Sequence, residues 1–108
     1  MMRTRFLLRL SWPLLAMSFV FANDALAERS GEQVVNTFCV ACHISGVAGA
    51  PRIGNKADWQ PREDKDITEL LASVTNGLNA MPAKGLCANC TEQELENAVR
   101  YMQEKASQ

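Results

Sequence analysis

The sequence contains little positive charge, few aromatic side chains and a single histidine. It has 11 Lys and Arg against 12 Asp and Glu, and only 6% of its 108 residues are aromatic. Without the first 27 residues, whose removal is argued below, 8 basic and 11 acidic side chains remain, a net charge of −3. Nucleic acid and anionic lipid surfaces both attract a positive footprint. This balance of charge argues against both as partners.

The sequence also lacks sustained alternation of apolar and polar residues, internal repeats and low-complexity tracts. Without alternation we expect no β-sheet, so the predicted fold class is all-α. No nucleophile–base pair, glycine-rich nucleotide loop or carboxylate dyad is present. Their absence argues against an enzyme.

No apolar run is long enough for a comfortable membrane span, which takes about 20 residues. The run near the N-terminus, residues 10–22, follows three arginines and precedes Ala25-Leu26-Ala27, a small-x-small pattern typical of signal-peptidase sites. We therefore expect residues 1–27 to be a cleaved signal peptide and residues 28–108 to be one exported, periplasmic domain. An uncleaved N-terminal anchor is the alternative, although no stop-transfer segment follows.

Three helices are predicted from capping residues and apolar periodicity, and a fourth, very short turn is expected at residues 57–60. The first runs from about Gly31 to Cys42 after Ser30, the second from about Ile67 to Asn76 after Asp66, and the third starts at the Thr91 capping box. A domain of this length has a marginal core of its own. Three to four short helices would therefore need an apolar group between them.

The segment Cys39-Val40-Ala41-Cys42-His43 has the C-x-x-C-H pattern of covalent haem attachment. Two cysteines at this spacing lie on one face of a helix, where both can form thioethers with the vinyl groups of one porphyrin. The histidine that follows is placed to ligate the iron. A zinc site, or a dithiol pair that happens to precede a histidine, is the alternative. We expect one covalently bound haem c, held by Cys39 and Cys42 and ligated by His43.

The sixth iron ligand has to be something other than histidine, because His43 is the only one in the chain. Methionine sulfur is the usual partner of histidine in electron-transfer haems, and it raises the iron potential. Met102 lies on the apolar stripe of the third predicted helix and is expected in the core. Met81 lies in a loop held extended before Pro82, which can cover a porphyrin face. We therefore favour Met81, with an open iron site as the alternative.

With these motifs the chain resembles the class I cytochromes c, and within them the cytochrome c5 group. The resemblance covers nearly all of residues 28–108. It depends on four segments: Cys39-Val40-Ala41-Cys42-His43, Gly49-Ala50-Pro51-Arg52-Ile53-Gly54, Asn76-Gly77-Leu78-Asn79-Ala80-Met81-Pro82 and Cys87-Ala88-Asn89-Cys90.

The resemblance implies a small all-α fold around the haem, in which the first and last helices cross near Gly31 and Tyr101. Glycine would allow the two backbones to approach closely there. It also implies that Pro51 packs on the His43 side and that its carbonyl orients the imidazole, which would fix the tautomer.

The second cysteine pair, Cys87 and Cys90, admits three interpretations. The pair could form a disulfide, act as a redox-active dithiol, or complete a four-cysteine zinc site with the first pair. The zinc site would compete with haem for Cys39 and Cys42, and the chain lacks the βαβ context of a thioredoxin-like enzyme. A structural disulfide is favoured, and the resemblance supports it.

Trp59 and Arg62 are candidate haem-pocket residues. The indole N–H of Trp59 could donate to a haem propionate or the ring could be ordinary core, and the Arg62 guanidinium could pair with the same group or be solvated. Arg52, Lys56 and Lys84 flank the expected haem loops. They would either orient an acidic redox partner or be scattered surface charge.

Together these features predict an electron carrier. A haem with both axial positions filled binds substrates poorly, so its iron would shuttle single electrons between redox proteins such as a membrane oxidase or reductase. A five-coordinate haem protein that binds a gas or peroxide is one alternative, and a structural zinc domain is the other.

Overall fold

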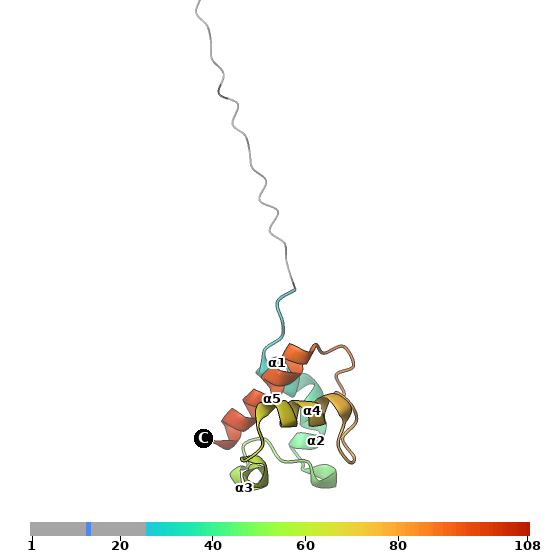
Figure 1. Ribbon diagram of the computed structural model, residues 1–108, viewed down its shortest axis with the longest axis vertical. Helices are drawn as coiled ribbons and strands as arrows, with labels where there is room; N and C mark the ends of the chain where they lie inside the picture. Colours follow the sequence, from blue (N-terminus) through green and yellow to red (C-terminus); the bar gives the residue numbers. More distant parts are fainter. Residues whose placement is uncertain (1–12, 14–25) are drawn as a thin grey trace, which may run out of the picture.

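The computed structural model describes Pro13 and residues 26–108, which form a cluster of short helices (Figure 1). The expected signal peptide lies almost wholly outside the described residues. In chain order the helices are α1 (Gly31–Val34), η1 (Val35–Cys39), α2 (Val40–His43), η2 (Val47–Gly49), α3 (Lys56–Trp59), η3 (Gln60–Arg62), α4 (Ile67–Asn76) and α5 (Glu92–Ala106). Within the described residues there is no strand, and no helix is long and apolar enough to cross a membrane. The prediction of an all-α fold is confirmed.

α1, η1 and α2 follow one another without a break and correspond to the first predicted helix. The segment begins at Ser30, whose side chain accepts a hydrogen bond from the backbone N–H of Gln33 while the Gln33 side chain accepts one from the N–H of Ser30. The sequence did not predict that η1 is a π-helical turn. A π turn holds more residues than an α turn and often lies beside a functional site. Here it ends at Cys39.

α1 lies directly against α5, and their contact is the most extensive between helices of the described chain (Figure 1). At Gly31 a β-carbon would lie 2.1 Å from the carbonyl oxygen of Asn97 and 2.8 Å from the Cβ of Tyr101. No side chain fits in that space, so only glycine allows the two backbones to approach this closely. The crossing predicted near Gly31 and Tyr101 is present.

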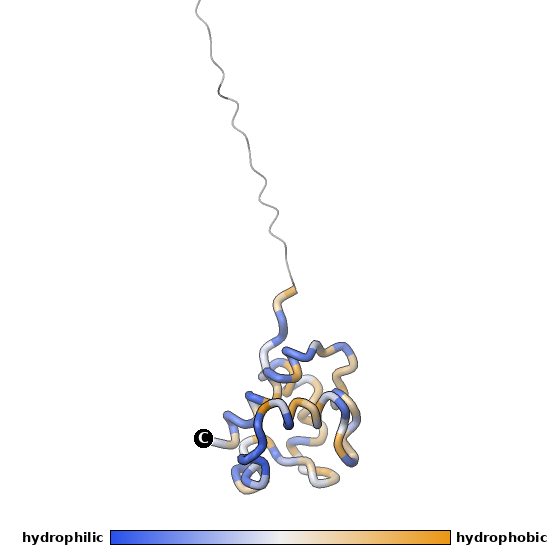
Figure 2. Tube along the Cα trace, in the orientation of Figure 1, coloured by the Kyte–Doolittle hydropathy of each residue, from blue (hydrophilic) through white to orange (hydrophobic). Residues whose placement is uncertain are grey.

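The core lies between α1, η1 and α5 and includes both cysteines of the second pair. Val34 and Val35 are fully buried, and Leu95, Ala98 and Met102 of α5 pack against them. The hydrophilic residues gather elsewhere, most clearly in the run that joins α3 to α4 (Figure 2). Several of these core side chains, among them Val34, Leu95 and Met102, also line a cavity described below.

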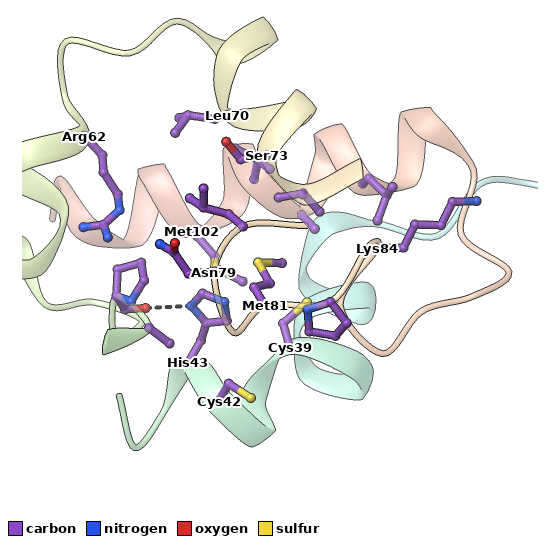
Figure 3. Close-up of a pocket in the computed structure, with 18 of the residues that line it drawn as sticks. Cys39, Cys42, His43, Arg62, Leu70, Ser73, Asn79, Met81, Lys84 and Met102 are labelled. Atoms are coloured by element: carbon purple, nitrogen blue, oxygen red, sulfur yellow. Dashed lines mark hydrogen bonds between the residues drawn. The ribbon is translucent and has the colours of Figure 1, made fainter. Parts of the chain in front are cut away.

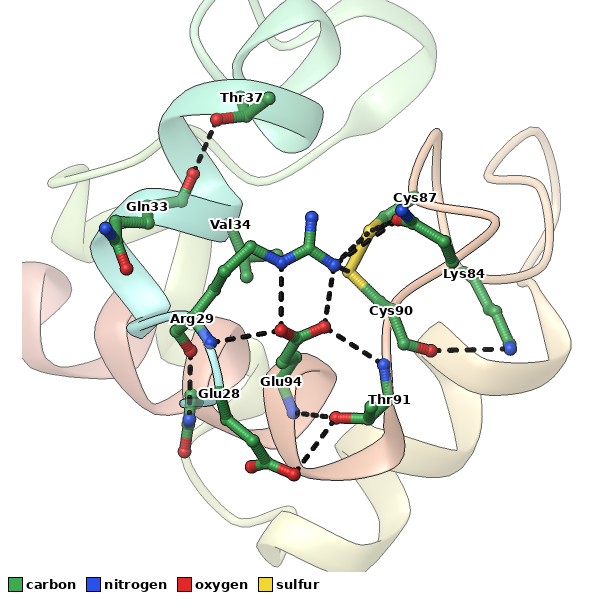
Figure 4. Close-up of polar contacts among 12 residues, drawn as sticks. Glu28, Arg29, Gln33, Val34, Thr37, Lys84, Cys87, Cys90, Thr91 and Glu94 are labelled. Carbon is green, nitrogen blue, oxygen red and sulfur yellow. Dashed lines mark hydrogen bonds and ion pairs between the residues drawn. A yellow bond between two sulfur atoms is a disulfide. The ribbon is translucent and has the colours of Figure 1, made fainter. Parts of the chain in front are cut away.

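An ion pair joins the segment before α1 to the start of α5 (Figure 4). The Arg29 guanidinium donates from Nε to Oε1 of Glu94 at 2.8 Å and from Nη2 to Oε2 at 2.7 Å. The backbone N–H of Arg29 donates to the same Oε1 at 3.0 Å. Glu94 also closes the capping box of α5, because its Oε2 accepts from the N–H of Thr91 at 3.1 Å. One buried carboxylate thus serves both the helix cap and a contact 65 residues away in the chain.

These hydrogen bonds lower the pKa of Glu94 from 4.5 to about 2, chiefly through the Arg29 side chain. Since the folded-state pKa is depressed, the ionised carboxylate stabilises the native protein fully above pH 4.5. This contribution is lost as the pH falls toward 2.

We expect Glu94→Gln to be less stable than the wild type at neutral pH and to lose less additional stability between pH 4.5 and 2. Denaturant midpoints measured across this range check the prediction. Glu96→Gln is the matched control, because Glu96 lies on the same helix and pairs with Arg100 at a more exposed position. Parallel pH profiles for Glu94→Gln and the wild type would contradict the assignment.

Candidate functional site

A cavity of about 420 Å³ opens beside the core (Figure 3). Its volume lies in the range of cofactor and ligand pockets. Most of its walls are apolar, and they come from the first helical segment, α4, α5 and two loops. The apolar lining includes Val34, Phe38, Leu70, Val74, Leu95, Ala98, Val99 and Met102.

Cys39 and Cys42 line this cavity from the end of η1 and from α2, and both are free thiols. Their spacing places them on one helical face. Burial, with a smaller effect from the neighbouring Cys42, raises the pKa of the Cys39 thiol to about 11. Cys39 is therefore a neutral thiol in an apolar wall, whereas Cys42 is exposed.

His43 ends α2, and the residue is 8% exposed. Its Nδ1 lies 2.7 Å from the carbonyl oxygen of Pro51 (Figure 3). A carbonyl only accepts hydrogen bonds, so Nδ1 carries the proton and Nε2 keeps its lone pair. The backbone N–H of Ile53 in turn donates to the carbonyl of His43 at 2.8 Å. The loop after α2 thus holds the imidazole in one orientation and one tautomer.

Met81 lies in the loop between α4 and α5, and its side chain enters the same cavity beside the His43 ring (Figure 3). The loop folds back through two hydrogen bonds between Leu78 and Met81, of 3.0 and 2.9 Å. Gly77, at φ +84°, allows this fold, because a β-carbon there would lie 2.8 Å from the Met81 carbonyl oxygen. Met102 is 6% exposed in the α5 core and also touches the cavity floor.

Trp59 is a buried residue of the cavity wall, but its indole N–H is already used. Nε1 donates to the carbonyl of Arg52 at 2.9 Å. The ring itself is part of the core, and its donor is engaged by this backbone carbonyl. A tryptophan with one donor can satisfy only one partner, and the sequence does not reveal which carbonyl lies within reach.

Arg62 lines the cavity from η3 (Figure 3). Its Nη1 donates to the backbone carbonyl of Asp58 at 2.7 Å. Its remaining guanidinium donors have no partner among the described residues. Arg62 therefore keeps donors for an acidic group bound in the cavity.

Of the three cations considered as a positive ring, Arg52 and Lys84 have partners within the protein, whereas Lys56 is exposed. Arg52 donates from Nε and Nη2 to the carboxylate of Asp58 at 2.7 and 3.0 Å. These bonds lower the pKa of Asp58 to about 2. Lys84 is partly buried, with its Nζ 3.5 Å from the carbonyl of Cys90. Arg52 is thus paired with a carboxylate of its own segment.

Cys87 and Cys90 form a disulfide with a Cα–Cα distance of 5.4 Å, and both are buried. A four-cysteine zinc site would need them as free thiolates. The described part of the chain also contains no group of three or more His, Cys, Asp or Glu side chains placed to hold a metal ion. The zinc alternative therefore has no geometric support.

Sequence reasoning did not assign several cavity residues that the structure brings to the site. Leu70 and Val74 lie within the second predicted helix, and nothing in the local sequence shows that they face a cavity. Asn79 also lines the cavity, with a left-handed φ of +52°. A positive φ in an asparagine is a turn feature, and the sequence signal for it was only the turn composition of the loop.

Comparison with known proteins identifies the family. The family of subunit III of cbb3-type cytochrome c oxidases matches residues 26–102. Cytochrome c5 of Azotobacter vinelandii is 46% identical over 76 residues, which are 68% of this chain and 92% of the relative. A mono-haem ferrocytochrome c from Shewanella putrefaciens is 43% identical with a TM-score of 0.62, over 70% of this chain and 94% of the other. The cytochrome in a crystal structure of an electron transfer complex of nitrite reductase with cytochrome c is 42% identical with a TM-score of 0.67, over 70% and 93%.

The described fold and cavity are those of a c-type cytochrome. The chain belongs to the class I c-type cytochromes, within the cytochrome c5 group. It carries one covalent haem c and is an electron carrier rather than an enzyme. The predictions of family, cofactor and function are therefore confirmed.

We expect Trp59→Phe to lower the free energy of unfolding by about 1–3 kcal/mol, because the Arg52 carbonyl loses its buried donor. The haem midpoint potential should stay at the wild-type value, since the N–H does not face the cofactor. Chemical denaturation and redox titration of the holoprotein check both expectations. A shifted potential with unchanged stability would instead show that the indole acts on a haem carboxylate.

Proposed function

We propose that this cytochrome transfers single electrons between redox proteins in the periplasm through a haem ligated by His43 and Met81. The observation that carries the proposal is the convergence of two thiols, one imidazole and the thioether sulfur of the Met81 loop on a single cavity, from residues up to 42 positions apart in the chain. When bound, the haem supplies an iron that alternates between two oxidation states.

Cys39 and Cys42 are proposed to hold the porphyrin through thioethers. They are the free thiols of the described chain, they share one helical face and they line the cavity. His43 is proposed as the first axial ligand. With Nδ1–H donated to Pro51, its Nε2 lone pair is the nitrogen available to a metal. The Pro51 carbonyl would also increase the basicity of the ring.

Met81 is proposed as the second axial ligand. The loop presents its side chain to the cavity that holds the imidazole, and the thioether is a soft donor that raises the potential when paired with histidine. Apolar walls and a filled coordination sphere exclude water and substrates from the metal. Arg62 is proposed to neutralise a haem carboxylate with the donors that Asp58 leaves unused.

The periplasmic location is proposed from the N-terminal sequence. Residues 1–27 combine a basic start, an apolar run and a small-x-small site, and cleavage after Ala27 would release residues 28–108. Leu26 and Ala27 are exposed, so a protease could reach the peptide bond after Ala27. A second cysteine pair closed as a disulfide also suits an oxidising compartment.

The cavity mouth is the proposed contact with redox partners. Exposed apolar side chains from two loops surround it, and we call this set the apolar rim: Val47, Ala48, Leu78, Ala80 and Pro82. No Asp or Glu occurs between Glu32 and Asp58, or between Glu69 and Glu92, so both loops lack carboxylates. A small, apolar and nearly uncharged contact suits a brief encounter. The nitrite reductase complex of a relative shows that such a cytochrome can dock on a redox enzyme.

We expect Met81→Ala to lose the weak red-end absorption band that reports methionine ligation in the oxidised protein, and to lower the midpoint potential. Met102→Leu is the matched control and should keep both, because Met102 belongs to the α5 core. Absorption spectra and redox titrations of both variants check this. An unchanged Met81→Ala spectrum would refute methionine ligation, and a high-spin wild-type spectrum would favour the five-coordinate alternative.

We expect Val47→Glu to slow electron self-exchange between oxidised and reduced copies about tenfold at low ionic strength, with recovery in salt, because both rims would then carry a like charge. NMR line broadening of mixed redox states measures this rate. Ala72→Glu is the control, since it adds the same charge on the exposed side of α4. Equal effects of the two variants would mean that net charge, rather than the rim, controls the encounter.

A further inference from the structure

The loop that carries Met81 is attached to the rest of the protein at few points. Its first half is held by the Leu78–Met81 pair and by the N–H of Lys84, which donates to the carbonyl of Val74 on α4 at 2.7 Å. The segment from Lys84 to Cys90 is closed by turn hydrogen bonds within itself and by the disulfide. We call this segment, Lys84 to Cys90, the second half of the Met81 loop. A contact that holds the disulfide in place therefore also holds this half of the loop.

Arg29 contacts this disulfide from outside the loop (Figure 4). Its Nη2 lies 3.7 Å from Sγ of Cys87 and 3.6 Å from Sγ of Cys90, and it donates to Oδ1 of Asn89 at 3.3 Å. Each of these contacts joins residues about 60 positions apart in the chain. They tie the segment before α1 to the end of the Met81 loop.

The guanidinium cannot turn away from the disulfide without breaking its pair with Glu94. Both oxygens of that carboxylate are engaged, one by Nε and one by Nη2. Glu94 is itself fixed by the capping box of α5. A planar guanidinium that is hydrogen-bonded at two of its nitrogen atoms has one orientation. In this orientation, Nη2 of Arg29 points toward the sulfur atoms.

The Arg29 guanidinium also lies over a residue of the cavity wall, Phe38. Its Cζ lies 5.3 Å from the centroid of the Phe38 ring, and Phe38 lines the cavity directly before Cys39. Arg29 thus touches the wall that carries the proposed haem attachment as well as the loop that carries the proposed methionine ligand. We call the cavity that would hold the haem the haem crevice, and Arg29 contacts both of these parts of its surroundings.

We infer that Arg29 is a positioning residue for Met81, holding the second half of its loop against the haem crevice through the disulfide. The inference rests on the proposed ligation by Met81. Displacement of a methionine ligand requires the loop to open locally, and the apparent affinity of a competing ligand is scaled by the population of that open state. Loss of the Arg29 contacts raises this population.

Imidazole is the probe, titrated into the oxidised holoprotein while the methionine band is followed. We expect Arg29→Gln to bind imidazole about tenfold more tightly than the wild type. The reason is that the closed state of the loop loses charged hydrogen bonds, so the open state that binds imidazole is more populated. Arg29→Lys should show the same direction, because one ammonium cannot reach Glu94 and both sulfur atoms together. It also provides a measurement if Arg29→Gln does not fold.

Val35→Ala is the control for global stability. Val35 is fully buried in the core, does not line the cavity and makes none of the Arg29 contacts, so its truncation destabilises the fold while leaving those contacts in place. We expect its imidazole affinity to stay within about twofold of the wild type, since local opening is not governed by global stability. If the Arg29 variants gain no more affinity than Val35→Ala, the inference is overturned.

A double variant separates this inference from the proposed function. In a Met81→Ala background, Arg29→Gln should add nothing to imidazole affinity, because no methionine is left to displace. A further gain in that background would overturn the positioning role. Wild-type imidazole affinity in Met81→Ala alone would instead refute the ligation itself, which is a different result.

Discussion

α1 crosses α5 at Gly31, where even one additional carbon would lie 2.1 Å from a backbone oxygen. The position of the site depends on this contact, because α1 continues through η1 into α2 and carries Cys39, Cys42 and His43 at its far end. The distance between α1 and α5 therefore sets the distance between the attachment residues and the cavity floor on α5. A wider crossing would enlarge the cavity and reduce the packing contact between its walls and a planar group.

Residues whose chemistry is determined by their sequence neighbours could be predicted. The attachment motif and its histidine are consecutive, and the Met81 loop carries its own proline. α4 runs from Ile67 to Asn76 as expected, because Asp66 caps it and Gly77 ends it. These signals are local, so one sequence is enough to find them.

The remaining features depend on partners that are distant in sequence. A single arginine before a predicted helix looks like surface charge, and its carboxylate lies 65 residues away. The indole N–H of Trp59 needed an acceptor, but only the folded chain shows that the acceptor is the Arg52 carbonyl. The π turn before Cys39 likewise reflects packing, because its residues would also suit an ordinary helix.

The two cysteine pairs have the same spacing and opposite accessibility. Cys87 and Cys90 are 1% and 4% exposed, whereas Cys42 is open to solvent. Thiol–disulfide exchange requires a thiolate to reach a sulfur atom in line. A reductant in the same compartment would therefore keep the first pair open for the cofactor while the folded chain shields the second. Burial thus gives two cysteine pairs of equal spacing different access to thiol–disulfide exchange.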